Sequence, residues 1–225
     1  MPRLPRLEYP GALYHVTARG VQQRAIFVDD RDRSNLLELL ARTLRDGDAS
    51  VLAFCLMGNH YHFVLQTRAA NLSALMQRIN GAYSLTFNQR HARRGHLFEG
   101  RFKAVHVDRD AHLLQACRYV DLNPVRAGLV DSPADWAWSI YRAHVGVAQA
   151  PWWLATADLH GALMGMAPND ALQVEAAQRR YAEWTTAGRG VPLWQEPQRN
   201  GFVTTELPAS GHVTNRADEG TLPLA

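Results

Sequence analysis

The chain has 225 residues, an apolar fraction of 47% and a formal net charge of +3, which is typical of a globular protein with a substantial core. It lacks both the roughly 18 uncharged apolar residues of a membrane span and an apolar signal-peptide segment after Met1. Cys55 and Cys117 lie far apart, which argues against a disulfide framework and a thiolate zinc site. We therefore expect a cytoplasmic protein with no membrane partner.

Basic residues are concentrated in the first two thirds of the chain. Residues 1–144 carry 19 Arg and Lys against 13 Asp and Glu, whereas residues 145–225 carry 5 against 8. A basic surface favours an anionic partner, of which nucleic acid is the commonest. Lys103 is the single lysine among 24 basic residues.

The predicted elements follow the order β-α-β-β-α-β. Strands are expected over residues 13–19, 51–57, 61–66 and 101–107, and helices over residues 31–45 and 72–87. Gly58-Asn59 predicts a tight hairpin turn, and Asn71 is the expected cap of the second helix. This order predicts an α+β protein with the ferredoxin-like split βαβ fold, in which both helices cover one face of an antiparallel sheet. The other face is expected to be open.

A third helix is expected after the fourth strand, from the cap Asp110 to Asn123. Pro124 should end it, because the residue before a proline is pushed out of the helical region. Tyr119 and Asn123 would lie one turn apart on one side of this helix. From the residues alone, Tyr119 also fits a half-buried packing role and Asn123 a helix cap.

Two histidines one residue apart, His60 and His62, interrupt the apolar strand over residues 61–66 at its start. Side chains alternate along a strand, so both imidazoles point to one face while Tyr61 and Phe63 point to the other. Neutral imidazole is a good ligand for divalent metals. Histidine pairs also occur as hydrogen-bonded core residues, so the pair alone leaves both roles open.

Four motifs occur in order along the chain. They are Tyr14-His15-Val16-Thr17-Ala18-Arg19-Gly20, Met57-Gly58-Asn59-His60-Tyr61-His62, Gly95-His96-Leu97-Phe98-Glu99-Gly100-Arg101-Phe102-Lys103, and Tyr119-Val120-Asp121-Leu122-Asn123-Pro124-Val125-Arg126-Ala127-Gly128-Leu129-Val130. Together they resemble the REP-associated tyrosine transposases of the single-tyrosine HUH superfamily, in which U is a bulky hydrophobic residue, here Tyr61. The resemblance covers residues 9 to about 145.

This resemblance implies a role for each matching residue. His60, His62 and Asn123 would bind Mg²⁺ or Mn²⁺, and Tyr119 would be the nucleophile. The implied activity is that of a metal-dependent single-strand DNA endonuclease and strand transferase, which works through a 5′-phosphotyrosine and needs no nucleotide cofactor. The implied substrate is single-stranded or hairpin DNA of palindromic genomic repeats.

The basic loop before the fourth strand is expected to contact this DNA. Phosphate contacts are expected from Arg19, Arg90, Arg93, Arg94, Arg101 and Lys103. Phe98, and with it Phe102, would stack on exposed bases. Runs of arginine are also common on merely solvated surfaces, so composition alone leaves that alternative open.

We expect a catalytic domain over residues 1–145, a helical extension over 146–202 that includes a helix over 171–187, and a flexible tail over 203–225. The protein is expected to be a monomer or a homodimer located at the nucleoid. Two alternatives remain at this stage, namely a hairpin-binding protein that has lost its chemistry and a nickase of the replication-initiator or relaxase type.

Overall fold

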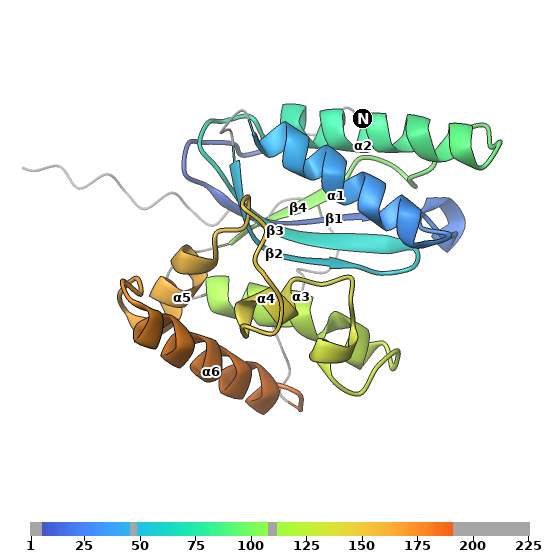
Figure 1. Ribbon diagram of the computed structural model, residues 1–225. Coiled ribbons are helices and arrows are strands. Elements are labelled where there is room, and N and C mark those ends of the chain that lie inside the picture. Colours follow the sequence, from blue (N-terminus) through green and yellow to red (C-terminus); the bar gives the residue numbers. More distant parts are fainter. Residues whose placement is uncertain (1–5, 46–48, 108–111, 191–225) are drawn as a thin grey trace, which may run out of the picture.

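Four strands and six α-helices follow one another in residues 6–45, 49–107 and 112–190, the residues that the computed structural model describes (Figure 1). The strands are β1 (Leu13–Arg19), β2 (Ala49–Leu56), β3 (His60–Thr67) and β4 (Lys103–Val107). The helices are α1 (Asp30–Leu44), α2 (Leu72–Arg90), α3 (Leu113–Arg126), α4 (Tyr141–His144), α5 (Thr156–Met164) and α6 (Ala171–Ala187), with 3-10 turns η1 (Val21–Gln23) and η2 (Pro133–Asp135).

The four strands form one antiparallel sheet in the order β2-β3-β1-β4. This is the topology of the ferredoxin-like split βαβ arrangement, so the predicted fold class is confirmed. The bounds expected for β1 and α6 also agree with the structure, whereas the strand expected from Arg101 begins only at Lys103.

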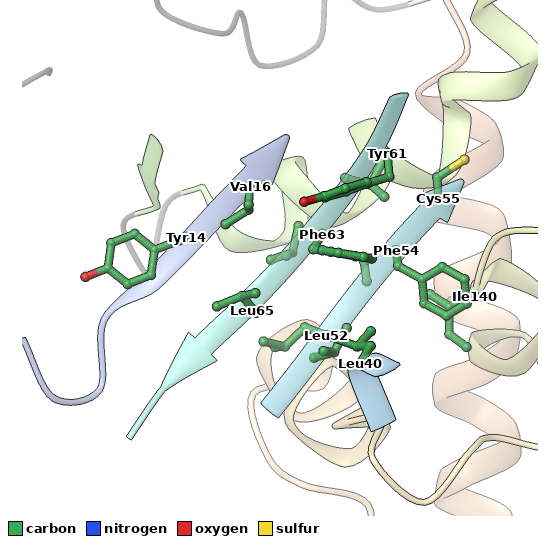
Figure 2. Packing of buried hydrophobic residues seen from close by; sticks show 14 of the residues in the cluster. Tyr14, Val16, Leu40, Leu52, Phe54, Cys55, Tyr61, Phe63, Leu65 and Ile140 are labelled. Carbon is green, nitrogen blue, oxygen red and sulfur yellow. The ribbon is translucent and has the colours of Figure 1, made fainter. Parts of the chain in front are cut away.

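Different helices cover the two faces of the sheet (Figure 1). Helices α1 and α2 lie on one face, where the Tyr61 hydroxyl donates a hydrogen bond to Asn80 of α2 at 2.7 Å. On this face Phe63 is paired in register with Val16 of β1 and Phe54 of β2, and Figure 2 shows the three side chains together in the core. The alternation predicted for β3 therefore directs its aromatic residues into this layer.

The opposite face, expected to be open, is covered by α3 and by the helices that follow it (Figure 1). Helix α3 lies across β2 and β3, and His62 beneath it is only 4% exposed. This face is therefore accessible at the rim of the sheet, where His60 is partly exposed, rather than from above.

Helix α3 differs from its prediction at both ends. Residue His112 occupies its N-cap position, and the expected cap Asp110 lies outside the described residues. Pro124 is inside the helix, which continues to Arg126. The turn after the proline is closed by Ala127 N–H to Asn123 C=O and by Leu129 N–H to Pro124 C=O, both at 3.0 Å. Pro124 removes one donor, but the helix ends one turn later, so few bonds are lost.

Helix α2 begins at the expected place with a different cap. Asn71 holds the N-cap position but makes no capping hydrogen bond with its side chain. The backbone N–H of Ser73 instead donates to Glu8 Oε1 at 3.1 Å. A carboxylate is well suited to a helix N-terminus, so the segment before β1 supplies the cap that the sequence assigned to Asn71.

The helices after α3 are joined to it by a buried hydrogen bond. The Tyr181 hydroxyl of α6 donates to Asp121 Oδ2 of α3 at 2.7 Å, and both side chains are fully buried. Burial raises the pKa of Asp121 to about 7, although the bond from Tyr181 acts in the opposite direction. Helix α6 therefore supports the helix that carries Tyr119. The division of the chain at residues 145 and 202 stays a prediction.

Cys55 and Cys117 are both buried and make no disulfide. Within the described ranges, no helix is long and apolar enough to cross a membrane.

Candidate active site at the hairpin end of the sheet

Three of the four sequence motifs meet at the end of the sheet where β1 finishes. The N–H of Gly20 donates to the carbonyl of Asn59 at 2.8 Å, which joins the β1 motif to the β2–β3 hairpin. Val21 N–H donates to Leu97 C=O, and Glu99 N–H donates to Arg19 C=O, both at 2.9 Å. The loop before β4 is thereby held against the same corner.

Gly20 is required at this corner because the backbone passes too close for a side chain. A Cβ at this position would lie 2.0 Å from the carbonyl oxygen of Arg24 and 2.9 Å from Ile26 Cγ2. Any other residue would push the turn after β1 away from the hairpin.

Three histidines, and not two, face α3 from the sheet. His60 and His62 share one face of β3 as predicted, with ring centroids 4.9 Å apart. Thr17 is the register partner of His62, which places His15 of β1 on the same face. The His15 and His62 rings are parallel within 2°, with centroids 5.1 Å apart, and His15 Nε2 lies 2.9 Å from His62 Nδ1. The sequence analysis missed His15, although β-alternation within its motif was a usable signal.

Tyr119 of α3 packs edge-on against two of these histidines. Its ring centroid lies 5.6 Å from that of His15 and 5.7 Å from that of His62. The guanidinium of Arg126 lies 5.7 Å from the centre of the Tyr119 ring. At this distance the guanidinium makes a cation–π contact with the ring.

Asn123 lies one helical turn beyond Tyr119, on the same helix. Its side-chain NH₂ donates to the Tyr119 carbonyl at 3.4 Å. The NH₂ group of Asn123 is thus turned toward its own helix.

Burial keeps the three imidazoles neutral. It lowers the pKa of His15 to about 3, and with the charge of Arg19 it lowers the pKa of His60 to about 4. Burial also lowers the pKa of His62, helped by its neighbours His15, His60 and Arg19. Neutral imidazole is the form that binds a metal ion.

The donor atoms fit a divalent cation in part. His62 Nε2 is buried and has no hydrogen-bond partner among the described residues. In that same part of the chain, no group of three or more His, Cys, Asp or Glu side chains is arranged to hold a metal ion. A third ligand of the cation would therefore have to be a residue of another type. The candidate that the fourth motif offers is the amide of Asn123. The roles of His60, His62 and Asn123 as ligands stay predictions.

The basic residues near this corner separate into two groups. Arg90 is paired with Asp29 and Asp32, so it is unlike the free cations that phosphate binding needs. Arg93 lies 5.5 Å from the centre of the Phe87 ring. Among the predicted phosphate contacts, the exposed side chains are Arg19, Arg94, Arg101 and Lys103. Their predicted phosphate contacts are compatible with this placement and stay predictions.

Phe98 lies in the core rather than on the surface. It is 9% exposed, and its ring centroid lies 6.2 Å from that of Tyr61 and 6.4 Å from that of Tyr83. Phe102 is also buried, at 6% exposure. This placement favours a packing role over base stacking for both residues, because neither ring face is offered to a base.

A family model described as "Transposase IS200 like" matches residues 9–123, or 115 of the 225 residues. The chain belongs to the IS200-like transposase family. Nuclease and transposase activity on DNA, generally with a divalent metal ion, is characteristic of this family. The resemblance drawn from the four motifs is thereby confirmed at the level of the family.

A solved structure supports the fold. The chain is similar to a REP-associated tyrosine transposase solved with a REP hairpin, with a TM-score of 0.56 and 18% identity over 69% of this chain and 92% of that one. tRNA(His) guanylyltransferase from Saccharomyces cerevisiae matches with a TM-score of 0.31 and 12% identity over 75% of this chain and 84% of that one, a likeness too weak to carry an argument. No curated protein matches the sequence significantly.

Proposed function

We propose that the protein is a metal-dependent single-strand DNA endonuclease and strand transferase that acts on hairpins of palindromic genomic repeats. Tyr119 would be the nucleophile, and His60, His62 and Asn123 would hold Mg²⁺ or Mn²⁺. The observation that carries the proposal is the edge-on contact of the Tyr119 ring with His15 and His62. It places the tyrosine of the fourth motif against His62 of the second motif and His15 of the first.

The chemistry proposed for Tyr119 is an in-line displacement at phosphorus. A bond forms between the Tyr119 oxygen and phosphorus, the bond from phosphorus to the 3′ oxygen breaks, and the departing oxygen takes up a proton. A bound divalent cation would polarise the scissile phosphate and offset its charge. Because the 5′-phosphotyrosine retains the energy of the cleaved bond, a 3′-OH can attack it in turn and restore a phosphodiester.

The proposed substrate form follows from the shape of the site. The sheet face beneath α3 is covered, and Tyr119 is partly buried, so a rigid duplex has no evident way to bring a phosphate to the hydroxyl. A flexible single strand beside a hairpin can bring a phosphate to the hydroxyl. The exposed cations Arg19, Arg94 and Lys103 would hold its phosphates, at the nucleoid in the cytoplasm.

The decisive experiment incubates the protein with a labelled hairpin that carries single-stranded flanks, in Mg²⁺ or Mn²⁺. Wild type should form a covalent adduct that survives denaturation, and Tyr119→Phe should form none while still binding the hairpin. Tyr14→Phe is the matched control, because Tyr14 is a buried tyrosine whose hydroxyl donates to the Leu7 carbonyl, and it should cleave normally.

Further arms of this experiment test the metal and the substrate. His60→Ala and His62→Ala should abolish cleavage, and Asn123→Ala should weaken it less because water can replace one oxygen ligand. Full activity in EDTA would refute the metal assignment. Equal cutting of fully paired DNA would favour an ordinary duplex nuclease, and hairpin binding with no adduct from wild type would favour a binding protein without chemistry.

A further inference from the structure

Arg19 lies beside the histidine pair on the sheet. It is the last residue of β1, and its register partner across the sheet is His60, the first residue of β3. Side chains of directly opposite residues in an antiparallel pair point to the same face, with Cβ atoms about 5 Å apart. The exposed Arg19 side chain therefore starts on the face that carries His60 and His62, at the rim of the site.

The charge of Arg19 acts on both histidines. Burial, and then the charge of Arg19, lower the pKa of His60 to about 4. The same charge contributes to the lowered pKa of His62, after burial and the neighbouring rings of His15 and His60. Because Coulomb energy is proportional to charge, a guanidinium that opposes one positive charge on these rings opposes a divalent cation at their nitrogen atoms about twice as strongly.

No acidic side chain offsets the charge of Arg19 within the described residues. Glu99 N–H donates to the Arg19 carbonyl at 2.9 Å, but Arg19 makes no ion pair with Glu99 or with any other residue in these ranges. Across the same ranges, no Asp or Glu joins His60 and His62 in a group that could hold a metal ion. The corner of the sheet is therefore positively charged before any cation binds.

The ligands proposed for the cation are all neutral. They are two imidazoles and the amide of Asn123. The carboxyl of Asp121, on the same helix, accepts a hydrogen bond from Tyr181 of α6 rather than pairing with Arg19. A divalent cation at this site would therefore have no negative ligand from these residues and a guanidinium beside it, an arrangement that disfavours binding until an anion arrives.

We propose that Arg19 keeps the cation affinity of this site low in the DNA-free protein, and that the scissile phosphate is the anion that makes the site bind a metal ion. The proposal rests on the proposed function. A phosphodiester carries one negative charge, which attracts both the guanidinium and the cation. Metal ion and hairpin should then bind cooperatively, and each should raise the affinity of the other by the same factor.

The first test measures Mn²⁺ binding by electron paramagnetic resonance of the free ion, in Tyr119→Phe protein so that the DNA stays uncut. Each titration is repeated after adding His60→Ala, which subtracts Mn²⁺ bound elsewhere on the DNA. A hairpin with single-stranded flanks should raise the affinity of the site by about tenfold. A neutral methylphosphonate at the bond that wild type cuts should remove most of this increase.

The second test changes Arg19 in the DNA-free protein at low salt. Arg19→Gln should raise Mn²⁺ affinity by about fivefold, whereas Arg19→Lys keeps the charge and should stay within about twofold of wild type. Arg68→Gln is the matched control, because Arg68 is an exposed arginine just beyond the other end of β3, about 25 Å from His60 along the strand. It should leave Mn²⁺ affinity unchanged. Melting curves show whether each variant is folded.

The inference and the proposed function fail in different ways. If the DNA-free protein bound Mn²⁺ as tightly as the hairpin complex, and His60→Ala abolished both, the inference would be refuted while the proposed function stood. Unchanged Mn²⁺ affinity in folded Arg19→Gln would refute the role of Arg19. If the hairpin complex bound Mn²⁺ no better than its His60→Ala counterpart, the metal site of the proposed function would itself be refuted.

Discussion

The helical layers on the two faces of the sheet each contain one buried carboxylate, and the two are stabilised in opposite ways. Asp32 of α1 is 1% exposed, and burial raises its pKa, but hydrogen bonds from His91, Val28 N–H and Arg90 outweigh burial and lower the pKa below its usual value. Asp121 of α3 is also fully buried, has the Tyr181 hydroxyl as its described partner, and has a pKa raised to about 7.

The two carboxylates hold different parts of the molecule in place. The charged cluster of Asp32, Arg90 and His91 ties α1 to the end of α2, from which the basic loop departs. The layer that carries Tyr119 is instead held by a hydrogen bond to a carboxyl that is partly protonated at neutral pH. Under the proposed function, a full negative charge two residues from Tyr119 would repel the phosphate that approaches its hydroxyl.

The largest effect is expected from Phe98→Ala in the α1–α2 layer. Removal of a buried aromatic ring should lower the free energy of unfolding by about 4 kcal/mol, as measured by urea denaturation. His96→Ala, an exposed neighbour, should change it by less than about 0.5 kcal/mol. Unchanged stability together with lost hairpin affinity would instead restore the base-stacking role for Phe98.

Asp32→Ala should break the charged cluster and leave Arg90 and His91 without their buried partner. We expect a loss of about 3 kcal/mol at pH 7, whereas Asp30→Ala, which removes an exposed carboxylate paired with Arg33, should cost less than about 1 kcal/mol. Because the folded pKa of Asp32 is lowered, its stabilisation is fully present above the unfolded pKa of about 4 and is lost as the pH falls through the folded pKa. The penalty of the mutation should therefore shrink in acid denaturation below pH 4. A constant penalty down to pH 2 would contradict the ionic origin.

Tyr181→Phe should have a smaller effect, in the opposite layer. It removes the described donor to Asp121 and should cost about 1–2 kcal/mol, with faster hydrogen exchange in α6 than in α1. If α3 depends on this support, DNA cleavage should fall while hairpin binding through the basic loop persists. Equal loss of exchange protection in both layers would mean that the layers unfold together.

The smallest effects are expected for single exposed cations of the basic loop. Arg94→Ala should weaken hairpin binding and reduce the slope of log K against log salt by about one unit. Arg90→Ala should lower stability with little change in that slope, because its charge is already paired with Asp29 and Asp32. The same slope change in both variants would show that the ion pairs do not set Arg90 apart.

The elements that follow from local pattern were predictable from the sequence. Alternation gave β1 and the orientation of β3, leucine spacing gave α1, and Gly58-Asn59 gave the hairpin, where Met57 N–H donates to His60 C=O at 2.9 Å. The placement of His60, His62 and Tyr119 around one point also agrees with the expectation, since strand alternation and a four-residue helical repeat are rigid rules.

Features that depend on contacts distant in the chain were not predictable. Alternation marks the sheet face of His15, but its contact with His62 depends on the register between β1 and β3. Glu8 caps a helix 65 residues later. Phe98 follows a run of basic residues, and this pattern predicts a surface position. The hydrogen bonds between the loop and the end of β1 instead direct the Phe98 side chain into the core. The end of α3 was misjudged because a proline in the last turn removes too little to stop a helix.

The turn after β1 contains two residues with a strained backbone conformation. Gln22 and Gln23 have φ values of 53° and 58°, in the left-handed region that residues with a side chain rarely adopt. The strain places the Gln23 carbonyl against Asn59, and so reaches His60. Glycine adopts this conformation without the penalty, so Gln23→Gly would release strain of about 1 kcal/mol while the carbonyl of residue 23 stays in place as the acceptor for Asn59. Stability can therefore be gained in this turn without moving the hairpin that carries His60.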